Sequence, residues 1–329
     1  MSTFSSHPVR ARACANIALI KYWGKRSDGA LNLPATSSLS LTLADLQTIT
    51  EVGVSADLEA HQVVLNDAPV DDLRVCAFLD HIRMLAGGDS PYASVLSSNN
   101  FPTAAGLASS ASGFAALTLA ATRAYGLDLS SDALSALARM GSGSAPRSLW
   151  GGFCVMHKGA REDGLDAVAA PLLEASQWPL EVVIAITEQG AKSVSSRQGM
   201  NHTMATSPYY GAWVSHNESQ LEAAKQAVLS QDFERLADLS EASALQMHAS
   251  AMAAEPGVLY WHAATVACLH AIRDLRAAGC GVFFTIDAGP QVKAICLPGA
   301  SAPIVEALTS IPGVVGVRHS QLGLGAEVL

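Results

Sequence analysis

Charge is scarce in this sequence: 15% of the 329 residues are Asp, Glu, Lys or Arg, and the formal net charge is −9. Duplex nucleic acid is bound mainly by many Lys and Arg side chains that neutralise phosphates, so we expect no nucleic acid partner. Half of the residues are hydrophobic, which favours a well-buried globular enzyme over a disordered or fibrous chain. A small anion bound in one basic pocket remains compatible with this composition.

Long apolar runs and export signals are also missing. No run of about 18 or more apolar residues occurs, so we expect no membrane-spanning helix and no membrane partner. The first residues lack a basic segment that leads into an apolar one, so we expect no secretory signal and a cytoplasmic location. No HExxH, GxSxG or paired Cys-His signature is present, which leaves a zinc site or a hydrolase nucleophile without support.

The cysteines are scattered and form no CxxC pair. Such spacing, in a chain without an export signal, is typical of reduced thiols that behave as small buried hydrophobic side chains. The six positions are Cys14, Cys76, Cys154, Cys268, Cys280 and Cys296.

The hydrophobic pattern predicts an α+β protein. Alternating and β-branched runs predict strands at 9–23, 37–55, 58–67 and 92–100. Helical spacing predicts helices at 71–88 and 129–140, and a long apolar helix between them that ends at Tyr125. A strand at 179–189 is followed by a polar stretch at 190–210. Helices at 212–231, 232–252 and 260–279 and strands at 281–289, 291–297 and 313–320 complete the chain.

Length and pattern together predict two lobes. A single hydrophobic core rarely grows past about 250 to 300 residues, and the pattern changes near the midpoint. We place an N-terminal lobe at residues 1–187, with helices on one face of its sheet, and a C-terminal lobe at 188–329.

The longest uncharged stretch runs from residue 90 to residue 122, and "PTAAGLASSASGFAAL" lies at its centre. Small residues let backbone N–H groups approach an anion, and the following helix points its positive end at the same place. Ser109 and Ser110 could add hydroxyls for phosphate or Mg²⁺. Close helix–sheet packing explains the same composition equally well, and the stretch is neither a Walker A loop nor a GxGxxG turn.

Two further segments carry reactive side chains. In "GSGSAPRS", Arg147 is a planar donor suited to carboxylate or phosphate, although a Gly/Ser run is often only a connector. Asp287 ends the apolar strand in "FFTIDAGP", where it could be a general base at a cleft or simply cap the turn. The polar stretch at 190–210 could be a ligand loop or an interdomain connector.

Basic residues gather at the N-terminus. The segment "IALIKYWGKR", residues 17–26, follows an apolar strand with a run of cations and aromatic rings. Either the fold or a ligand has to supply partners, because no acid occurs before position 28. The five bases that precede it are Arg10, Arg12, Lys21, Lys25 and Arg26.

Six segments in order resemble those of the GHMP kinase superfamily and, within it, the mevalonate diphosphate decarboxylase family. They are "NIALIKYWGKR", "LNLPATSSLSLTL", "NNFPTAAGLASSASGFAAL", "GSGSAPRSLWGGF", "VSSRQGM" and "IDAGPQVK", and they span about residues 11–293. The resemblance implies a two-lobed GHMP-kinase-like fold. Its N-terminal lobe would resemble the ribosomal protein S5 domain 2-like fold, its C-terminal lobe would be an α/β sandwich, and the active-site cleft would lie between them.

The resemblance also implies an ATP- and Mg²⁺-dependent lyase of the mevalonate pathway of isoprenoid biosynthesis. It would decarboxylate (R)-5-diphosphomevalonate to isopentenyl diphosphate, with ADP, phosphate and CO₂, after phosphorylation of the substrate 3-hydroxyl. Both substrates are small molecules, and a homodimer is implied at the family level.

Site residues follow from the resemblance by motif position. The implied catalytic residues are Asp287, as base on or orienting group for the 3-hydroxyl, Lys21, near the transferred phosphoryl group, and Arg147, at the substrate carboxylate. The implied substrate-binding residues are Asn16, Tyr22, Trp23, Lys25, Ser142, Ser144 and Arg147. The implied ATP-binding residues are Pro102, Ala104, Ala105, Gly106, Leu107, Ala108, Ser109, Ser110, Ser195 and Ser196, with Ser110 also a candidate Mg²⁺ ligand.

One departure from the family pattern and three alternatives remain. Gln291 stands where the family commonly has Asn, which bears on a contact behind Asp287. A related enzyme could phosphorylate mevalonate or a phosphomevalonate without decarboxylation, or decarboxylate the monophosphate. A noncatalytic ligand sensor of the same fold would be expected to lack the acid or the arginine, and neither is missing.

Overall fold

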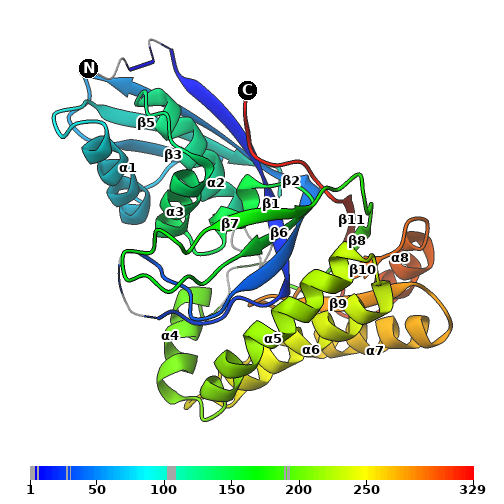
Figure 1. Ribbon diagram of the computed structural model, residues 1–329. Coiled ribbons are helices and arrows are strands. Elements are labelled where there is room, and N and C mark those ends of the chain that lie inside the picture. The colour runs from blue at the N-terminus through cyan, green and yellow to red at the C-terminus, as the bar shows by residue number, and fades with distance from the viewer. Residues whose placement is uncertain are drawn as a thin grey trace.

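A computed structural model describes residues 4–5, 7–26, 29, 31–101, 109–188, 190 and 193–329. Two sheets, one of eight strands and one of four, are flanked by helices (Figure 1). This confirms the α+β class and the two-lobed organisation. The described helices include none that is both long and apolar enough to cross a membrane. The six cysteines are free thiols, four of them buried, as the scattered spacing predicts.

The larger sheet is built around two long strands that pair with each other in antiparallel fashion, β1 and β2. Its path is β12-β1-β2-β5-β3-β4, with β6 paired to β2 and β7 to β6, and only β3 and β5 run parallel. The strands are β1 Val9–Ile20, β2 Ser38–Ser55, β3 Gln62–Leu65, β4 Ala68–Pro69, β5 Tyr92–Asn99, β6 Phe153–Met156, β7 Ala169–Leu173 and β12 Glu327–Val328.

Three helices cover one face of this sheet: α1 Leu73–Leu85, α2 Ser109–Ala124 and α3 Ser131–Gly141 (Figure 1). Local signals in the sequence fix two of their starts, because Asp72 caps α1 and Ser130 caps α3 by accepting from backbone N–H groups. Buried alanines on α2 let this helix pack closely on the sheet. The predicted helices of this lobe are confirmed.

The smaller sheet has the order β11-β8-β10-β9, and all of its pairs are antiparallel. Its strands are β8 Glu181–Ile186, β9 Val282–Ile286, β10 Val292–Cys296 and β11 Gly316–Gln321. Helices α5 Tyr210–Leu229 and α6 Phe233–Met252 pack between the two sheets and share a core with both. Helices α7 Ala263–Ala277 and α8 Ser301–Thr309 cover the outer face of the smaller sheet.

Some elements were not predicted from sequence. They are the helix α4, Ser196–Thr206, within the polar stretch, together with α8, β7, β12 and the short 3₁₀ helix η1, Ala145–Leu149. Strand β8, assigned from sequence to the N-terminal lobe, pairs only with strands of the C-terminal sheet. The lobe boundary after residue 187 stays a prediction. Because of the pairing of β8, we propose a boundary before Glu181 instead.

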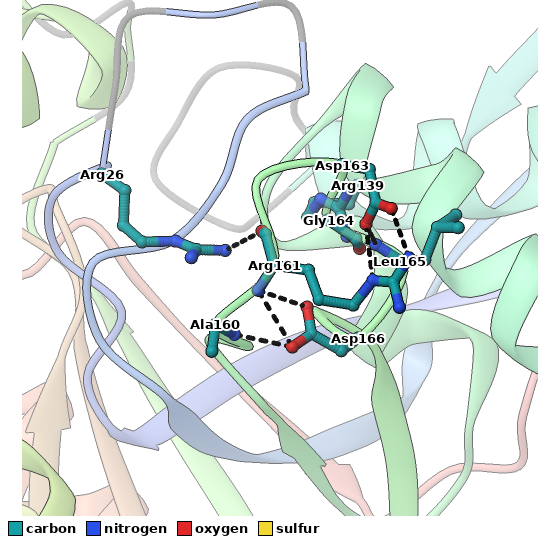
Figure 2. Close-up of polar contacts among 8 residues, drawn as sticks. All are labelled: Arg26, Arg139, Ala160, Arg161, Asp163, Gly164, Leu165 and Asp166. Atoms are coloured by element: carbon teal, nitrogen blue, oxygen red, sulfur yellow. Dashed lines mark hydrogen bonds and ion pairs between the residues drawn. The ribbon is translucent and has the colours of Figure 1, made fainter.

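Two arginines, the buried Arg139 and the exposed Arg26, fasten the loop that connects β6 to β7 (Figure 2). Arg139, on α3, donates to the carbonyls of Gly164 and Ala167 in this loop, and Arg26 donates to the carbonyls of Lys158 and Arg161 at 3.1 and 3.2 Å. Arg26, unassigned from sequence, therefore has a structural role.

The same loop is also folded by its own acids. Asp166 accepts from the backbone N–H groups of Ala160 and Arg161, while Asp163 pairs with the guanidinium of Arg161 (Figure 2). These contacts close the loop into a compact turn against α3.

Candidate active site

One cavity of about 770 Å³ lies between the lobes and collects the predicted site residues that the structure describes. This volume falls within the range that small-molecule sites occupy. The predicted residues that line it are Asn16, Lys21, Tyr22, Trp23, Lys25, Ser109, Ser110, Ser142, Ser144, Arg147, Ser195, Ser196 and Asp287. Their roles stay predictions. Pro102, Ala104, Ala105, Gly106, Leu107 and Ala108 lie outside the described residues.

Asp287 sits between two buried lysines. Its Oδ1 lies 2.7 Å from Nζ of Lys21, just past β1, and its Oδ2 lies 3.3 Å from Nζ of Lys293, on β10. Burial alone would raise the pKa of the Asp287 carboxyl, but the charges of the two lysines outweigh burial and hold it well below its usual range. About a quarter of the Asp287 side chain, 26%, remains exposed, so an ionised carboxylate faces the cavity.

Lys21 is a strongly perturbed cation. Burial lowers the pKa of its ammonium group to about 8, although Asp287 opposes the shift. Its Nζ also donates to the carbonyl of Ala18 at 2.8 Å. Its main chain is held from the opposite lobe, because its N–H donates to Oγ of Ser243 and its carbonyl accepts from Asn217. Lys21 is thereby fixed in position beside Asp287.

Arg147 is buried in η1 and is oriented by neutral partners. Its Nε donates to Oδ1 of Asn16 at 3.2 Å, and its Nη1 donates to Oγ of Ser38 at 2.9 Å. Asn16 is fixed in turn, because its Nδ2 donates to Ser148 and to the carbonyl of Ser144. No acid forms an ion pair with Arg147 among the described residues. Its charge is therefore directed at the cavity by groups that do not cancel it.

The aromatic residues after β1 present polar atoms inside the protein. The hydroxyl of Tyr22 and Nε1 of Trp23 are buried without a hydrogen-bond partner among the described residues. Both side chains line the cavity, and the Arg147 guanidinium lies 5.7 Å from the Tyr22 ring centroid. Buried donors normally find a partner, so these two atoms fit an anionic ligand that enters the cavity.

Lys25 is held at the same end of the cavity. Its Nζ donates to Oδ1 of Asn32 at 2.7 Å, and Nδ2 of Asn32 donates to the carbonyls of Arg139 and Met140 at the end of α3. Asn32 adopts a left-handed backbone conformation, φ 49°, which Asn tolerates better than most residues. The lysine is therefore tied to the start of the loop that carries Ser142 and Ser144.

The serines form a polar wall. Oγ of Ser142 lies 3.1 Å from Oγ of Ser144 and donates to Oγ of Ser110 at 3.4 Å. Ser110 stands in the first turn of α2, whose positive end faces the same wall. The wall can hold phosphate oxygens.

Helix α4 closes another side of the cavity. Ser195 caps it, and Gln198 completes a capping box. Gly199 lies against the rings of Tyr260 and Trp23, where a Cβ atom would overlap the Tyr260 hydroxyl. Ser195, Ser196 and the nearby Arg197 and Gln198 line the cavity. The polar stretch is therefore a wall of the site rather than a connector alone.

The far end of the cavity is apolar and was not predicted. Val63, Leu65, Val95 and Leu117 line it, next to a row of polar side chains on β2 and β5. Within this row Thr50 and Ser97 share a hydrogen bond of 2.9 Å. A flat apolar slot with a few polar groups suits a nucleobase.

Sequence reasoning also missed Lys293 and Asn32. Lys293 carried a signal, since it interrupts the apolar run "VKAIC" close to Asp287. Asn32 carried none beyond its place in "LNLP". Gln291 holds the end of β8: it accepts from N–H of Thr187 at 2.6 Å and donates to the carbonyl of Glu188 at 2.7 Å.

The cavity fits a Mg²⁺–nucleotide better than a metal held by protein alone. Within the described residues no group of three or more His, Cys, Asp and Glu side chains could hold a metal ion. The carboxylates that line the cavity there are Asp72, which caps α1, and Asp287. Mg²⁺ usually keeps waters and binds substrate phosphates, so Ser110 could supply one oxygen ligand beside them.

Comparisons with known proteins agree over most of the chain. Residues 13–169 match the diphosphomevalonate decarboxylase-like N-terminal domain, and residues 182–316 match the mevalonate 5-diphosphate decarboxylase C-terminal domain. Diphosphomevalonate decarboxylase mvd1 of Aspergillus fumigatus is 38% identical over 92% of this chain and 80% of its own length.

Solved structures show the same likeness. Mevalonate diphosphate decarboxylase from Staphylococcus aureus is 37% identical, with a TM-score of 0.91 over 98% of each chain. The complex of MDDEF with MVAPP, AMPPCP and magnesium is 38% identical, with a TM-score of 0.90 over 98% of each chain.

The wall opposite Tyr22 permits a paired test. A Cβ atom at Gly143 would overlap the Tyr22 hydroxyl, whereas nothing lies within 4 Å of a Cβ at Gly113, in α2. We expect Gly143→Ala to lower the free energy of unfolding by about 1–3 kcal/mol through overpacking. Gly113→Ala should raise it by roughly 0.5–1 kcal/mol, because alanine favours a helix. Urea denaturation measures both, and a Gly143→Ala protein as stable as wild type would contradict the packing.

Proposed function

Because the chain belongs to the diphosphomevalonate decarboxylase family, we propose that it converts (R)-5-diphosphomevalonate and ATP to isopentenyl diphosphate, ADP, phosphate and CO₂, with Mg²⁺. The observation that carries the proposal is the convergence of Lys21, Arg147 and Asp287 on one cavity from three distant parts of the chain. An acid beside a buried lysine can orient a hydroxyl for phosphoryl transfer, and an arginine with neutral partners can hold a carboxylate.

The diphosphate end of the substrate belongs at the segment that follows β1. Tyr22 and Trp23 offer donors that are buried and have no partner in the part of the chain that the structure describes, and Lys25 adds a cation held by Asn32. Ser142 and Ser144 border the same region. In the cavity these groups surround an anion from several sides, which positions the substrate before the reaction.

The nucleotide belongs along the rest of the cavity. The apolar slot between β2, β5 and α2 suits the adenine base, and Ser109, Ser110, Ser195 and Ser196 are placed for phosphate oxygens. When bound, Mg²⁺ neutralises charge on the phosphates.

The reaction needs positioning more than strong protein acids or bases. Asp287 accepts a hydrogen bond from the tertiary 3-hydroxyl and aims its oxygen at the γ-phosphorus, while Lys21 stabilises charge on the transferred group. The hydroxyl gives up its proton to Asp287 as the O–P bond forms. The C3–O bond of the new phosphate ester then breaks, and phosphate leaves with the bonding electrons, so that C3 becomes electron-poor. The C–C bond to the carboxylate breaks, its electrons form the alkene, and CO₂ departs. Arg147 orients that carboxylate, and we infer that its hold weakens in the transition state, because a tight ion pair opposes electron release.

Related reactions are less well supported. A kinase or a monophosphate decarboxylase would bind a less charged substrate, so it would need less positive charge on the protein at the diphosphate end of the cavity. At that end the chain provides Lys25, Tyr22 and Trp23 together. The relatives and solved structures named above are diphosphomevalonate decarboxylases, which favours the diphosphate substrate. A homodimer stays a prediction of the family resemblance, which sedimentation analysis tests. A cytoplasmic location stays a prediction from the sequence.

Replacement of Asp287 tests its role directly. Asp287→Asn keeps the shape but removes the acceptor charge, so we expect kcat to fall by roughly 10² to 10⁴. The assay follows isopentenyl diphosphate, CO₂ and phosphate from ATP with each of mevalonate, the monophosphate and the diphosphate. Wild type should release CO₂ only from the diphosphate. Full activity of Asp287→Asn would show the assignment to be wrong, and CO₂ release from the monophosphate would favour the alternative enzyme.

The pH dependence tests Lys21. Because the pKa of Lys21 is lowered to about 8, the cation is present below that pH and is lost as the pH rises through it. We expect kcat/KM for diphosphomevalonate to fall along an alkaline limb near pH 8. In the matched variant Lys21→Arg the charge persists, so this limb should vanish from whatever activity remains. An unchanged limb in that variant would assign the titration to another group.

A further inference from the structure

Lys293 is a buried cation beside Asp287 that the reaction scheme above does not use. It lies within β10, between β8 and β9, and its side chain is 2% exposed. Its neighbours Val292, Ala294, Ile295 and Cys296 are fully buried apolar residues. An ammonium group in such a strand is costly unless an anion compensates it, and Asp287 is the acid in contact with it.

The geometry divides the carboxylate of Asp287 between two lysines. Nζ of Lys21 contacts Oδ1, and Nζ of Lys293 contacts Oδ2. A carboxylate offers about four lone-pair positions, so about two remain for a ligand after both contacts. Since the carboxylate is fastened at both oxygens, it cannot rotate without breaking an ion pair.

We propose that Lys293 is a positioning residue: together with Lys21 it holds Asp287 ionised and in one orientation, so that the remaining lone pairs meet the substrate 3-hydroxyl. This inference rests on the proposed function. It gives the two lysines different tasks, because Lys21 borders the cavity and can turn toward the transferred phosphoryl group, whereas Lys293 does not line the cavity. When Lys21 engages the phosphoryl group, Lys293 still compensates the charge of Asp287.

The groups that face Asp287 come from four elements. They are Lys21 after β1, Lys293 on β10, Arg147 in η1 and His248 on α6. Burial, reinforced by the charge of Lys21, lowers the pKa of His248 to about 3, so this imidazole is neutral in the assay range. Three cations therefore act on one carboxylate. Lys293 also lowers the pKa of Lys21, after burial has made the larger contribution.

Removal of this charge should shift the alkaline side of the pH profile. The pKa of Asp287 rises in Lys293→Met from far below its usual range, so this carboxyl stays ionised wherever activity is assayed. The pKa of Lys21 also rises, because a repelling cation is lost. We therefore expect the alkaline limb of the kcat/KM profile to move to higher pH, by about one unit. We also expect kcat to fall roughly tenfold to a hundredfold with a much smaller change in KM, since only the orientation of Asp287 is disturbed.

Two variants serve as controls for this measurement. Lys225→Met removes a surface lysine that pairs with Glu222 on α5, and it should leave the profile unchanged. Lys293→Arg keeps the charge and should leave the alkaline limb near its wild-type pH, even where its size lowers kcat. An alkaline limb that stays in place in Lys293→Met, or that moves equally in Lys293→Arg, would overturn the proposal.

A stability cycle tests the pair without any turnover. Alone, Lys293→Met should lower the melting temperature, because Asp287 loses one of its two partners. In the Asp287→Asn background the same change should raise it, because Lys293 is then a buried cation without its anion. Equal effects in the two backgrounds would overturn the pairing. The wild-type protein could show no decarboxylase activity while Lys293→Met changes the melting temperature in opposite directions in the two backgrounds. In that case the proposed function fails and the Lys293–Asp287 pair stands.

Discussion

The ion group of Asp287 and its two lysines is the interaction on which the site depends. Lys21 follows β1 of the larger sheet, whereas Asp287 directly follows β9 and Lys293 lies on β10 of the smaller one. The group therefore joins the two sheets at the floor of the cavity. Because a buried charge that loses its partner is strongly destabilising, the ion group holds the two sheets in a fixed relative position at this point. Hydrogen bonds from Lys21 to α5 and α6 add to the same connection.

This ion group also constrains the chemistry. A carboxylate whose pKa lies far below its usual range is a weak base, so Asp287 is poorly suited to removing a proton from a hydroxyl before the phosphoryl group moves. It remains a good hydrogen-bond acceptor. In a loose phosphoryl transfer the hydroxyl becomes acidic only as the new O–P bond forms, and a weak base is then sufficient. The site thus favours orientation first and proton transfer late.

Local patterns predicted much of this structure, and contacts between distant segments account for the rest. The strands and helices with clear periodicity appear where expected, and caps such as Asp72 and Ser130 mark helix starts. The sequence did not predict the lobe to which β8 belongs, because the hydrophobic pattern of a strand does not show which other strands pair with it. Helix α4 was missed because its sequence is polar, although Ser195 and Gln198 form a capping-box signal. Lys293 was missed although it interrupts an apolar strand, because its contact with Asp287 joins two neighbouring strands and no local pattern shows which groups they bring together.

The cations after β1 show how the fold supplies partners without abolishing charge. Lys21 meets an acid, Asp287, for which we propose a task of its own at the substrate hydroxyl. Lys25 is oriented by the amide of Asn32, and Arg147 by Asn16 and Ser38. The neutral partners of Arg147 fix its direction and leave its field intact, whereas an acid would cancel much of that field. This difference agrees with the proposed roles, in which Lys21 takes part in the transfer and Arg147 holds the substrate carboxylate.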